Sequence, residues 1–371
     1  MRVLHVISGD LWAGAEAQAL ALLVELDRLV DVEVTAALMN EGALAERLRA
    51  AGISVTVLHE SRASSLRIVL ELRRLMNSWR PDVVHTHRTK ENVLGSIANA
   101  IGRRAVCVRT VHGSDEGSAT GFRGLVRSSL ATLNVWTGRW LQDRIVAVSA
   151  ELATRLRTVY GSDHVIVIEN GVDTEALSKL RPLVALRASD PLAVHVGFVG
   201  RVVPVKRVDI FVEVAARLCN AGDGRWFFHV IGDGPLLSQM KYLARHGEVG
   251  DRVAFYGHRE DAASMIAALD VMMICSDHEG LPMCLLEAMA LGTAVVAHDT
   301  GGIAAAIGSR GNGFVVSPNV ADAYVAALKE MRGRADLARR TWTRARANTE
   351  YSASRNAKRM AALYQSLLAD G

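Results

Sequence analysis

The chain has 371 residues, of which 50% are hydrophobic, 5% aromatic and 22% charged. This length exceeds the roughly 100–200 residues of one ordinary domain and indicates two. The formal charge of +4 is a small excess, typical of proteins that bind small anions, so we expect no nucleic-acid partner. The apolar runs fall short of the ~20 residues that span a bilayer, and the four cysteines lack the spacing of a metal or disulfide framework.

The first half of the chain alternates short Val- and Ile-rich runs with segments of helical periodicity, a pattern typical of parallel β-α-β units. Strands are expected at 2–7, 32–38, 53–58, 82–85, 105–111, 144–148 and 164–168. Helices are expected at 15–29, 42–51, 65–78, 89–101 and 150–158. The pattern predicts one doubly wound sheet in residues 1–180. Because the chain opens on a strand and shows no secretory leader, we expect a cytoplasmic location.

Ligands of parallel sheets bind at the carboxyl ends of the strands, so the residues after each strand are the candidates. Gly14 follows the first strand and either brings backbone N–H groups to a phosphate or makes a plain turn. His85 and His87 end another strand, but two histidines without a further nearby ligand predict no metal site. His112 follows strand 105–111 and places an imidazole that either donates to a substrate hydroxyl or serves the fold.

A basic segment at 103–144 carries seven arginines against three acidic residues, and Trp136 and Trp140 lie one helical turn apart within it. Two interpretations stay open. A helix with Trp on one face and Arg on the other is typical of docking on an anionic membrane surface. A basic amphipathic helix that packs on a sheet shows the same pattern.

The second half repeats the alternation after the N-G-V-D turn at 170–173. Periodicity fades over 174–190, where we place a linker. Strands are expected near 193–199, 226–231, 252–256, 271–274, 294–297 and 313–316, which predicts a second sheet in 190–350. Residues 319–370 are helical in pattern, with breaks near Gly333 and Thr349, and the last helix, 352–371, is expected to return to the first domain.

Two cations follow strand 193–199. Arg201 and Lys206, separated by a Pro-containing loop, are placed to converge on a diphosphate, and cations there would replace the metal ion that other diphosphate enzymes use. The alternative is that both are solvated surface residues. The G-D-G turn at 232–234 is a weak signal, and the chain has no dinucleotide fingerprint, P-loop or D-x-D motif.

Two carboxylates follow strand 271–274. Pro282 is predicted in the first turn of a helix whose backbone N–H groups, from about 281 to 284, favour an anion. Glu279 lies beside this anion site, and Glu287 lies over one turn into the helix, where a carboxylate can accept hydrogen bonds from a diol. The alternative is a solvated loop residue and an outward-facing helix residue.

In their order and spacing, these motifs resemble glycosyltransferase family 4, retaining enzymes of the GT-B fold, over nearly the whole chain. The resemblance is carried by E-x7-E from Glu279 to Glu287 together with G-R-V-V-P-V-K-R-V-D, I-G-D-G-P, E-N-G-V-D, T-V-H-G and G-A-E. It implies an α/β chain with two Rossmann-like domains facing each other across a cleft. The first would bind the acceptor and the second the nucleotide-sugar.

The resemblance also implies residue roles. His112 and Glu279 are similar to the catalytic pair, and Arg201, Lys206 and Glu287 to the ligands of diphosphate and ribose. The remaining donor-binding positions are Gly14, Gly280, Leu281 and Met283. The implied reaction moves a sugar from a UDP- or GDP-sugar to a lipid-linked or polysaccharide-precursor glycan, without metal or cofactor, in the cytoplasm or at the cytoplasmic face of a membrane.

The sequence departs from the family pattern at two positions, and three other classes of protein are alternatives. Many relatives have E-G-F-G where this chain has E-G-L-P, so Pro282 removes one backbone donor, and Ala13 stands where the family usually has another glycine. A nucleotide-sugar epimerase of the same architecture is the main alternative. A pyridoxal-dependent phosphorylase, which is a much longer chain, and a sensor without turnover fit the motifs less well.

Overall fold

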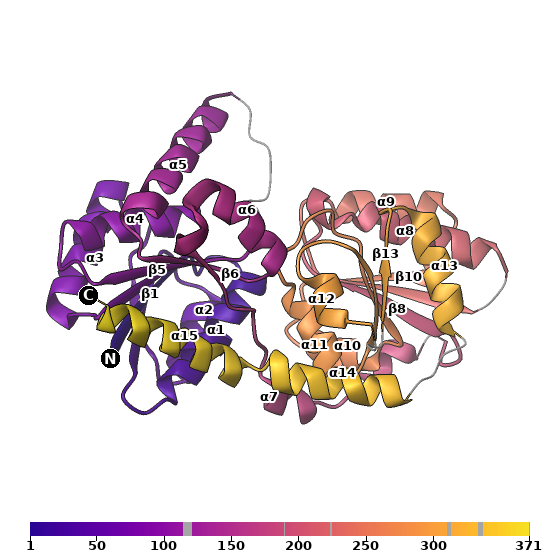
Figure 1. The fold of residues 1–371 in the computed structure, drawn as a ribbon. Coiled ribbons are helices and arrows are strands. Elements are labelled where there is room, and N and C mark those ends of the chain that lie inside the picture. Colours follow the sequence, from indigo (N-terminus) through magenta and orange to yellow (C-terminus); the bar gives the residue numbers. More distant parts are fainter. Residues whose placement is uncertain (114–120, 189, 223–224, 310–312, 333–336, 371) are drawn as a thin grey trace. The chain divides into compact units, whose positions relative to one another are not determined.

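The computed structural model describes residues 1–113, 121–188, 190–222, 225–309, 313–332 and 337–370, with the side chains of 121–128 and 337–339 left aside. The chain forms two compact units (Figure 1). Unit 1 comprises Met1–Gly171 and Ala353–Gly371, and unit 2 comprises Val172–Ser352. Each unit is an α/β domain built on one parallel sheet.

Unit 1 contains a seven-stranded sheet in the order β3-β2-β1-β4-β5-β6-β7. Its strands are β1 (Arg2–Ile7), β2 (Glu33–Leu38), β3 (Ser54–Val57), β4 (Val83–His87), β5 (Val106–Val111), β6 (Arg144–Ala147) and β7 (Val165–Val167). Its helices are α1 (Gly14–Asp27), α2 (Ala43–Ala50), α3 (Ser65–Trp79), α4 (Thr89–Ala100), α5 (Gly121–Trp140), α6 (Ala150–Tyr160), η1 (Ser162–His164) and α15 (Ala353–Ala369).

The last helix, α15, packs on α1 in unit 1 (Figure 1). Its buried apolar side chains recur at intervals of three and four residues and so form one face, namely Ala357, Met360, Ala361, Tyr364 and Leu367. They join the leucines of α1 in a single apolar core. Removing this face from water stabilises the attachment of α15, because hydrophobic burial scales with the apolar area covered.

Unit 2 contains a six-stranded sheet in the order β10-β9-β8-β11-β12-β13. Its strands are β8 (Val194–Val199), β9 (Trp226–Ile231), β10 (Val253–Gly257), β11 (Val271–Ile274), β12 (Ala294–His298) and β13 (Gly313–Val316). Its helices are α7 (Thr174–Ser178), η2 (Val184–Arg187), η3 (Pro204–Lys206), α8 (Val208–Asn220), α9 (Leu237–His246), η4 (Gly250–Arg252), α10 (Ala262–Ala268), α11 (Met283–Leu291), α12 (Ile303–Ile307), α13 (Ala321–Arg332) and α14 (Leu337–Glu350).

The strands of unit 2 are mostly apolar, as expected of a parallel sheet with both faces covered, and His195, His229 and His298 are the histidines within them. All six residues of β9 are buried, and α8 packs Phe211 edge-on against Phe228 at a ring-centroid distance of 5.5 Å. The predicted class, two Rossmann-like parallel sheets, is confirmed. Every predicted strand is present, with ends that differ by two residues at most.

The predicted domain boundary at 180–190 is wrong. Unit 2 begins at Val172, which pairs with Ser352 in an isolated parallel bridge and donates its N–H to the carbonyl of Tyr351 at 2.9 Å. Asp173 then caps α7, which contacts α11 within the same unit. Residues 174–190 therefore belong to the packed body of unit 2, although their short elements leave no long periodic pattern in the sequence.

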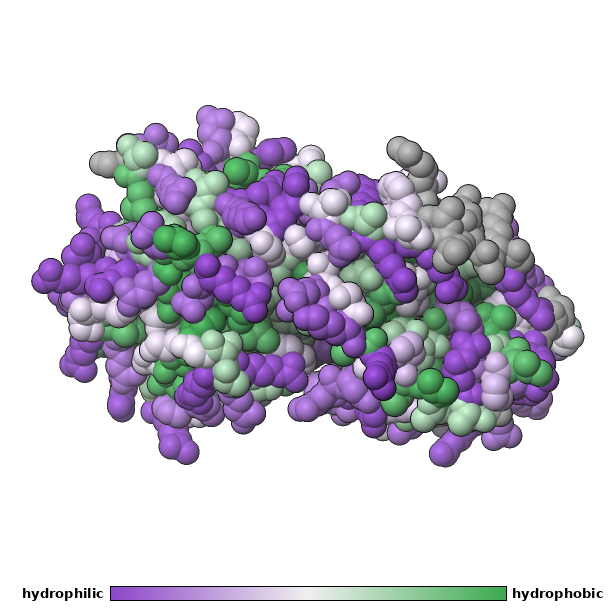
Figure 2. All heavy atoms as spheres, turned by 90° about the horizontal axis from the view of Figure 1, so that it is seen from below, coloured by the Kyte–Doolittle hydropathy of each residue, from purple (hydrophilic) through white to green (hydrophobic). Residues whose placement is uncertain are grey.

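The surface of the face seen in Figure 2 is mostly hydrophilic, with hydrophobic side chains in groups between polar ones. Among the helices that the structure describes, none has the length and apolar character needed to cross a membrane. Part of the basic segment at 103–144, residues 114–120, lies outside the described residues. Its helix is α5, in which Trp136 is 48% and Trp140 73% exposed.

Candidate functional site

Two of the predicted site residues, one donor-binding and one catalytic, meet at the carboxyl edge of the unit 2 sheet. Lys206 ends η3 after β8, and Glu279 follows β11, the neighbouring strand. The Nζ atom of Lys206 lies 2.5 Å from Oε1 of Glu279, and the hydroxyl of Ser276 donates to the same oxygen at 2.6 Å. With side-chain exposures of 21% and 11%, this is a partly buried ion pair, which solvent screens less than a surface pair.

Sequence reasoning missed the residues that hold the loop of Glu279. Arg207, at a positive φ of 47°, pairs with Asp277 at 3.3 Å and with Asp209 at 2.9 Å. Asn319 donates to the carbonyl of Cys275 at 2.8 Å and to the carboxylate of Asp277 at 2.9 Å. These bonds tie the segment after β11 to α8 and to the loop after β13. The sequence feature that could have indicated this support is the arginine directly after Lys206.

Close backbone contacts also fix this loop. Gly301 has a φ of 63°, and a Cβ atom there would lie 2.4 Å from the carbonyl oxygen of Glu279. The next residue, Gly302, donates its N–H to the carbonyl of Gly280 at 2.7 Å. In the G-D-G turn, a Cβ on Gly232 would lie 1.9 Å from the carbonyl oxygen of Gly200. Glycine is required at both positions because no side chain fits.

Helix α11 begins one residue later than predicted. Pro282 is the N-cap, with φ −65° and ψ 133°, and Met283 is the first helical residue, so the placement of Pro282 in the first turn is wrong. The first bond within the helix runs from the N–H of Leu286 to the carbonyl of Pro282. The N–H groups at the start of the helix therefore belong to 283–285 rather than to 281–284.

Three predicted site residues act electrostatically on the thiol of Cys284 in the first turn of α11. Burial raises the pKa of this thiol to about 12, Lys206 opposes the shift, and Glu279 and Glu287 add to it. Glu287 lies on the same helix, where burial raises the pKa of its carboxyl to about 7. Lys206, Glu279 and Glu287 thus lie within electrostatic range of one point, whereas Arg201 lies half-buried in the loop before Lys206.

The raised pKa of Glu287 has a consequence for stability. In the folded protein the pKa of Glu287, about 7, lies above its ordinary value of 4.5. The protonated carboxyl therefore contributes to the free energy of unfolding in full below pH 4.5, and this contribution is lost as the pH rises to 7. Glu287→Gln keeps the shape without the charge. We expect it to raise Tm by about 2–4 °C at pH 8 and to leave Tm unchanged near pH 4.5, as measured by thermal melts. An equal shift at both pH values would contradict this.

In unit 1, Gly14 is the first residue of α1 and is exposed to solvent, so its backbone N–H lies at a helix start as expected. Two residues further on, the carboxylate of Glu16 is buried and lies 2.7 Å from Nη2 of Arg88. Arg88 follows β4, precedes α4 and has a positive φ of 51°. Sequence reasoning missed this ion pair, which joins the residues after β1 to those after β4.

His112 lies directly after β5, as predicted. Its Nε2 atom lies 3.0 Å from Nδ1 of His87. Burial lowers the pKa of His112 to about 3, and the positive charges of Arg88 and Arg109 lower it further. The ring is therefore a neutral imidazole at physiological pH, which donates from one nitrogen and accepts at the other.

His85 and His87 have a third histidine beside them, contrary to expectation. The nitrogen atoms of His5, His85 and His87 lie within 4.8 Å of one another, and all three rings are buried. The rings stack at 9–31° to each other, so their lone pairs lie in nearly parallel planes rather than converging. His85 already bonds the hydroxyls of Tyr364 and Thr110. This geometry fits hydrogen bonding better than tetrahedral coordination of a metal.

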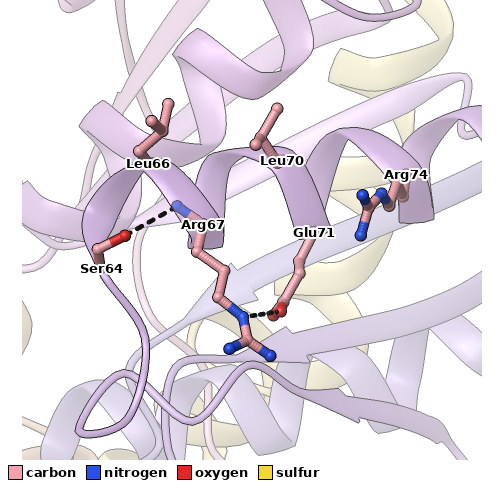
Figure 3. A pocket seen from close by; sticks show the side chains of 6 residues that line it. All are labelled: Ser64, Leu66, Arg67, Leu70, Glu71 and Arg74. Carbon is pink, nitrogen blue, oxygen red and sulfur yellow. Dashed lines mark hydrogen bonds and ion pairs between the residues drawn. The ribbon is translucent and has the colours of Figure 1, made fainter.

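A hollow lies on the surface of α3 (Figure 3), and its lining includes neither the Lys206–Glu279 pair nor the histidines of unit 1. Its lining residues all come from α3 or its N-cap Ser64. Arg67 pairs with Glu71 one turn on, at 2.8 Å, and Leu66 and Leu70 lie on the surface. Such a one-sided surface does not enclose a small molecule in the way that an enzyme site does.

Comparison with known proteins places the chain among glycosyltransferases. The model "Glycosyl transferases group 1" matches residues 193–347, and the model "Glycosyltransferase Family 4" matches residues 12–176. The structure is similar to that of Anabaena HepE in complex with UDP-glucose, with a TM-score of 0.83, 22% identity and coverage of 99% of this chain and 100% of that one. At this identity the likeness concerns the fold, which is GT-B.

Sequence relatives agree. A galactosyltransferase from Escherichia coli, described as "UDP-Gal:alpha-D-GlcNAc-diphosphoundecaprenol alpha-1,3-galactosyltransferase", is 27% identical over 71% of this chain and 69% of its own length. A D-inositol 3-phosphate glycosyltransferase from Nocardia farcinica is 33% identical over 55% of this chain and 48% of its own. With a glycosyltransferase model matching the main part of each unit and relatives of the same class, this chain belongs to glycosyltransferase family 4.

Proposed function

We propose that this chain transfers a sugar, with retention of anomeric configuration, from a UDP-sugar to a hydroxyl of a lipid-linked or polysaccharide-precursor glycan. The uridine donor is favoured over a guanosine donor because the E. coli relative is named for UDP-Gal and the HepE structure contains UDP-glucose. The lipid-linked acceptor is favoured by the diphosphoundecaprenol in the name of the same relative.

The observation that carries this proposal is the meeting of Lys206 and Glu279 beside the start of α11. A diphosphate is bound by Lys206, Arg201 and the N–H groups at the start of the helix, because cations and a helix N-terminus both stabilise negative charge. Gly280, Leu281 and Met283 supply backbone next to it. Glu287 accepts the ribose hydroxyls, and Glu279 holds the donor sugar.

In the proposed reaction, the acceptor oxygen attacks the anomeric carbon on the face from which the diphosphate leaves. The bond from that carbon to the diphosphate breaks, and the acceptor proton passes to the departing phosphate oxygen. Lys206 and Arg201 stabilise the charge that develops on this oxygen. His112, as a neutral imidazole, donates to a substrate hydroxyl in unit 1, and the helix start at Gly14 offers a backbone N–H to an anionic group of the substrate.

The test is a reaction of purified protein with UDP-sugars, with and without a diphospholipid-linked acceptor. We expect UDP release that depends on acceptor, and an α-linked product from an α-linked donor by NMR. Conversion of the donor sugar with the diphosphate still attached would instead identify a nucleotide-sugar epimerase. A donor screen by melting temperature selects the sugar first, because a ligand of the native state raises Tm.

Removal of the Lys206 ammonium is expected to weaken turnover more than binding. Lys206→Met keeps the length of the side chain and removes the charge that neutralises the departing diphosphate. We expect kcat to fall about 10- to 100-fold with KM for the donor changed less than about threefold. Lys179→Met, in an exposed pair with Glu175, is the control and should leave both constants unchanged. A wild-type kcat in Lys206→Met would contradict the assignment.

We propose that the protein's own cations, rather than a divalent metal, neutralise the diphosphate. Transfer is therefore expected to proceed at the same rate after dialysis against EDTA and with added Mg²⁺ or Mn²⁺. The measurement is UDP release per protein molecule under the three conditions. A rate that collapses with EDTA and returns with Mn²⁺ would overturn this part of the proposal.

We also propose that α5 docks on the anionic cytoplasmic surface of a membrane. In Figure 1 the helix projects from unit 1, and its exposed Leu133, Trp136 and Trp140 could enter the headgroup layer. Co-sedimentation with vesicles of phosphatidylglycerol is the test. We expect the wild type to bind these vesicles, the binding to weaken with salt, and the double variant Trp136→Ala, Trp140→Ala to lose it. If the wild type and the double variant bind to the same extent, the proposal is wrong.

A further inference from the structure

The histidines of unit 1 form a hydrogen-bonded chain that ends at His112. Nδ1 of His5 lies 3.1 Å from Nε2 of His87, and Nδ1 of His87 lies 3.0 Å from Nε2 of His112. The chain exists because β1, β4 and β5 are adjacent in the sheet and their histidines share one face. His85 stacks on both His5 and His87 but bonds only hydroxyl groups.

All three rings of the chain are neutral at physiological pH. Burial lowers the pKa of His5 to about 3 and holds the pKa of His87 well below its ordinary value. A neutral imidazole carries one N–H and one bare nitrogen. Two hydrogen bonds between three such rings therefore permit only two arrangements, with every proton pointing toward His112 or every proton pointing toward His5.

The two arrangements differ in where an N–H is left without a partner. Nε2 of His5 and Nδ1 of His112 are both buried atoms that have no hydrogen-bond partner among the described residues. With protons pointing toward His5, the spare N–H lies on His5, whose ring is 0% exposed. With protons pointing toward His112, it lies on Nδ1 of His112, an atom that is also buried but belongs to a partly exposed ring directly after β5, at the strand end where ligands of parallel sheets bind. A buried N–H without an acceptor is rare because it is costly.

We infer that His5 and His87 are positioning residues that hold His112 in the Nδ1–H tautomer, so that this ring presents a hydrogen-bond donor to the substrate. The role toward substrate rests on the proposed function, whereas the tautomer is a property of unit 1 alone. His87 accepts from His5 and donates to His112, and this leaves Nε2 of His112 as an acceptor. His5 starts the chain by donating from Nδ1.

The direct test is the ¹⁵N spectrum of the histidine rings in the whole protein labelled with [¹⁵N]histidine. The His112 signals are assigned by their loss in His112→Ala. We expect a protonated Nδ1 and a bare Nε2 for His112 in the wild type. In His87→Phe the ring of His112 loses its donor, and the proton is expected on Nε2, with kcat lower by about 10-fold and KM for the donor unchanged.

His85→Phe is the matched control, because it removes a buried ring of the same stack without breaking the chain. We expect it to leave the tautomer of His112 in place. His5→Phe, which leaves Nε2 of His87 without a donor, is expected to give a mixture of the two tautomers. A wild-type His112 with its proton on Nε2 overturns the inference, and so does an unchanged tautomer in His87→Phe.

The wild-type spectrum decides the question even where a variant fails to fold. It also separates this inference from the proposed function. Transfer activity together with an Nε2–H ring refutes the inference alone, whereas an Nδ1–H ring in a protein that releases no UDP from any donor refutes the proposed function alone.

Discussion

Glu279→Ala is expected to lower kcat for sugar transfer about 1,000-fold, with Tm within about 2 °C of the wild type. The carboxylate accepts from Lys206 and Ser276 and is 11% exposed, so it is held in one orientation before substrate arrives. In the proposed reaction it also holds the donor sugar, and a preorganised charge at the reacting centre contributes about 10²- to 10³-fold to rate. Removing it also breaks the ion pair with Lys206.

Two control variants distinguish the loss of the Glu279 charge from a loss of folding. Glu279→Gln retains an oxygen for Ser276 and should recover part of the rate, whereas Glu213→Ala removes a half-exposed carboxylate paired with Arg217 on α8 and should change nothing. The measurements are kcat from UDP release and Tm from thermal melts. A Glu279→Ala rate within threefold of the wild type would show that this carboxylate does not take part.

His112→Ala is expected to lower kcat about 100- to 1,000-fold, a loss in the range that positioned proton donors contribute. The ring lies after β5 at the strand end and bonds His87, so truncation removes the last member of the histidine chain. His246→Ala, which removes a ring on the surface helix α9, is the control and should leave the rate unchanged.

The same ring predicts the shape of the pH profile. Because the pKa of His112 is lowered to about 3, the ring stays neutral from pH 5 to pH 8 and should add no limb to the rate in that window. The free energy of unfolding should instead fall as the pH drops below 6.5, because His112 binds a proton in the unfolded chain but not when its ring is buried in the folded protein. A titration of kcat near pH 6.5 that disappears in His112→Ala would contradict the neutral ring.

The local pattern of the chain sufficed for the architecture. Strands of Val and Ile buried on both faces, alternating with helices that carry an apolar stripe, permit few arrangements other than two parallel sheets. The domain boundary was misplaced because 172–190 is held by contacts with distant residues, such as the bond from Val172 to Tyr351, and these leave no periodic mark. The start of α11 shifted by one residue because Pro282 is compatible with either the cap or the first turn.

Much of the candidate site could be read from single residues, because catalytic chemistry needs particular side chains at strand ends. Lys206, Glu279, Glu287 and His112 were each predicted in this way, and the first two indeed meet. Their supports were not predictable. Arg207 and Asp277 are 70 residues apart, and no pattern in the sequence links them.

The class of fold, the family and the residue types that bear the chemistry follow from local periodicity and from motifs of a few residues, both of which can be read along the chain. Which groups touch depends on the folded arrangement. His5, His87 and His112 lie in or directly after three strands that become neighbours only when β1, β4 and β5 pair, and burial lowers the pKa of their rings. Contact and dielectric environment are properties of the packed chain, and they set the protonation on which the chemistry depends.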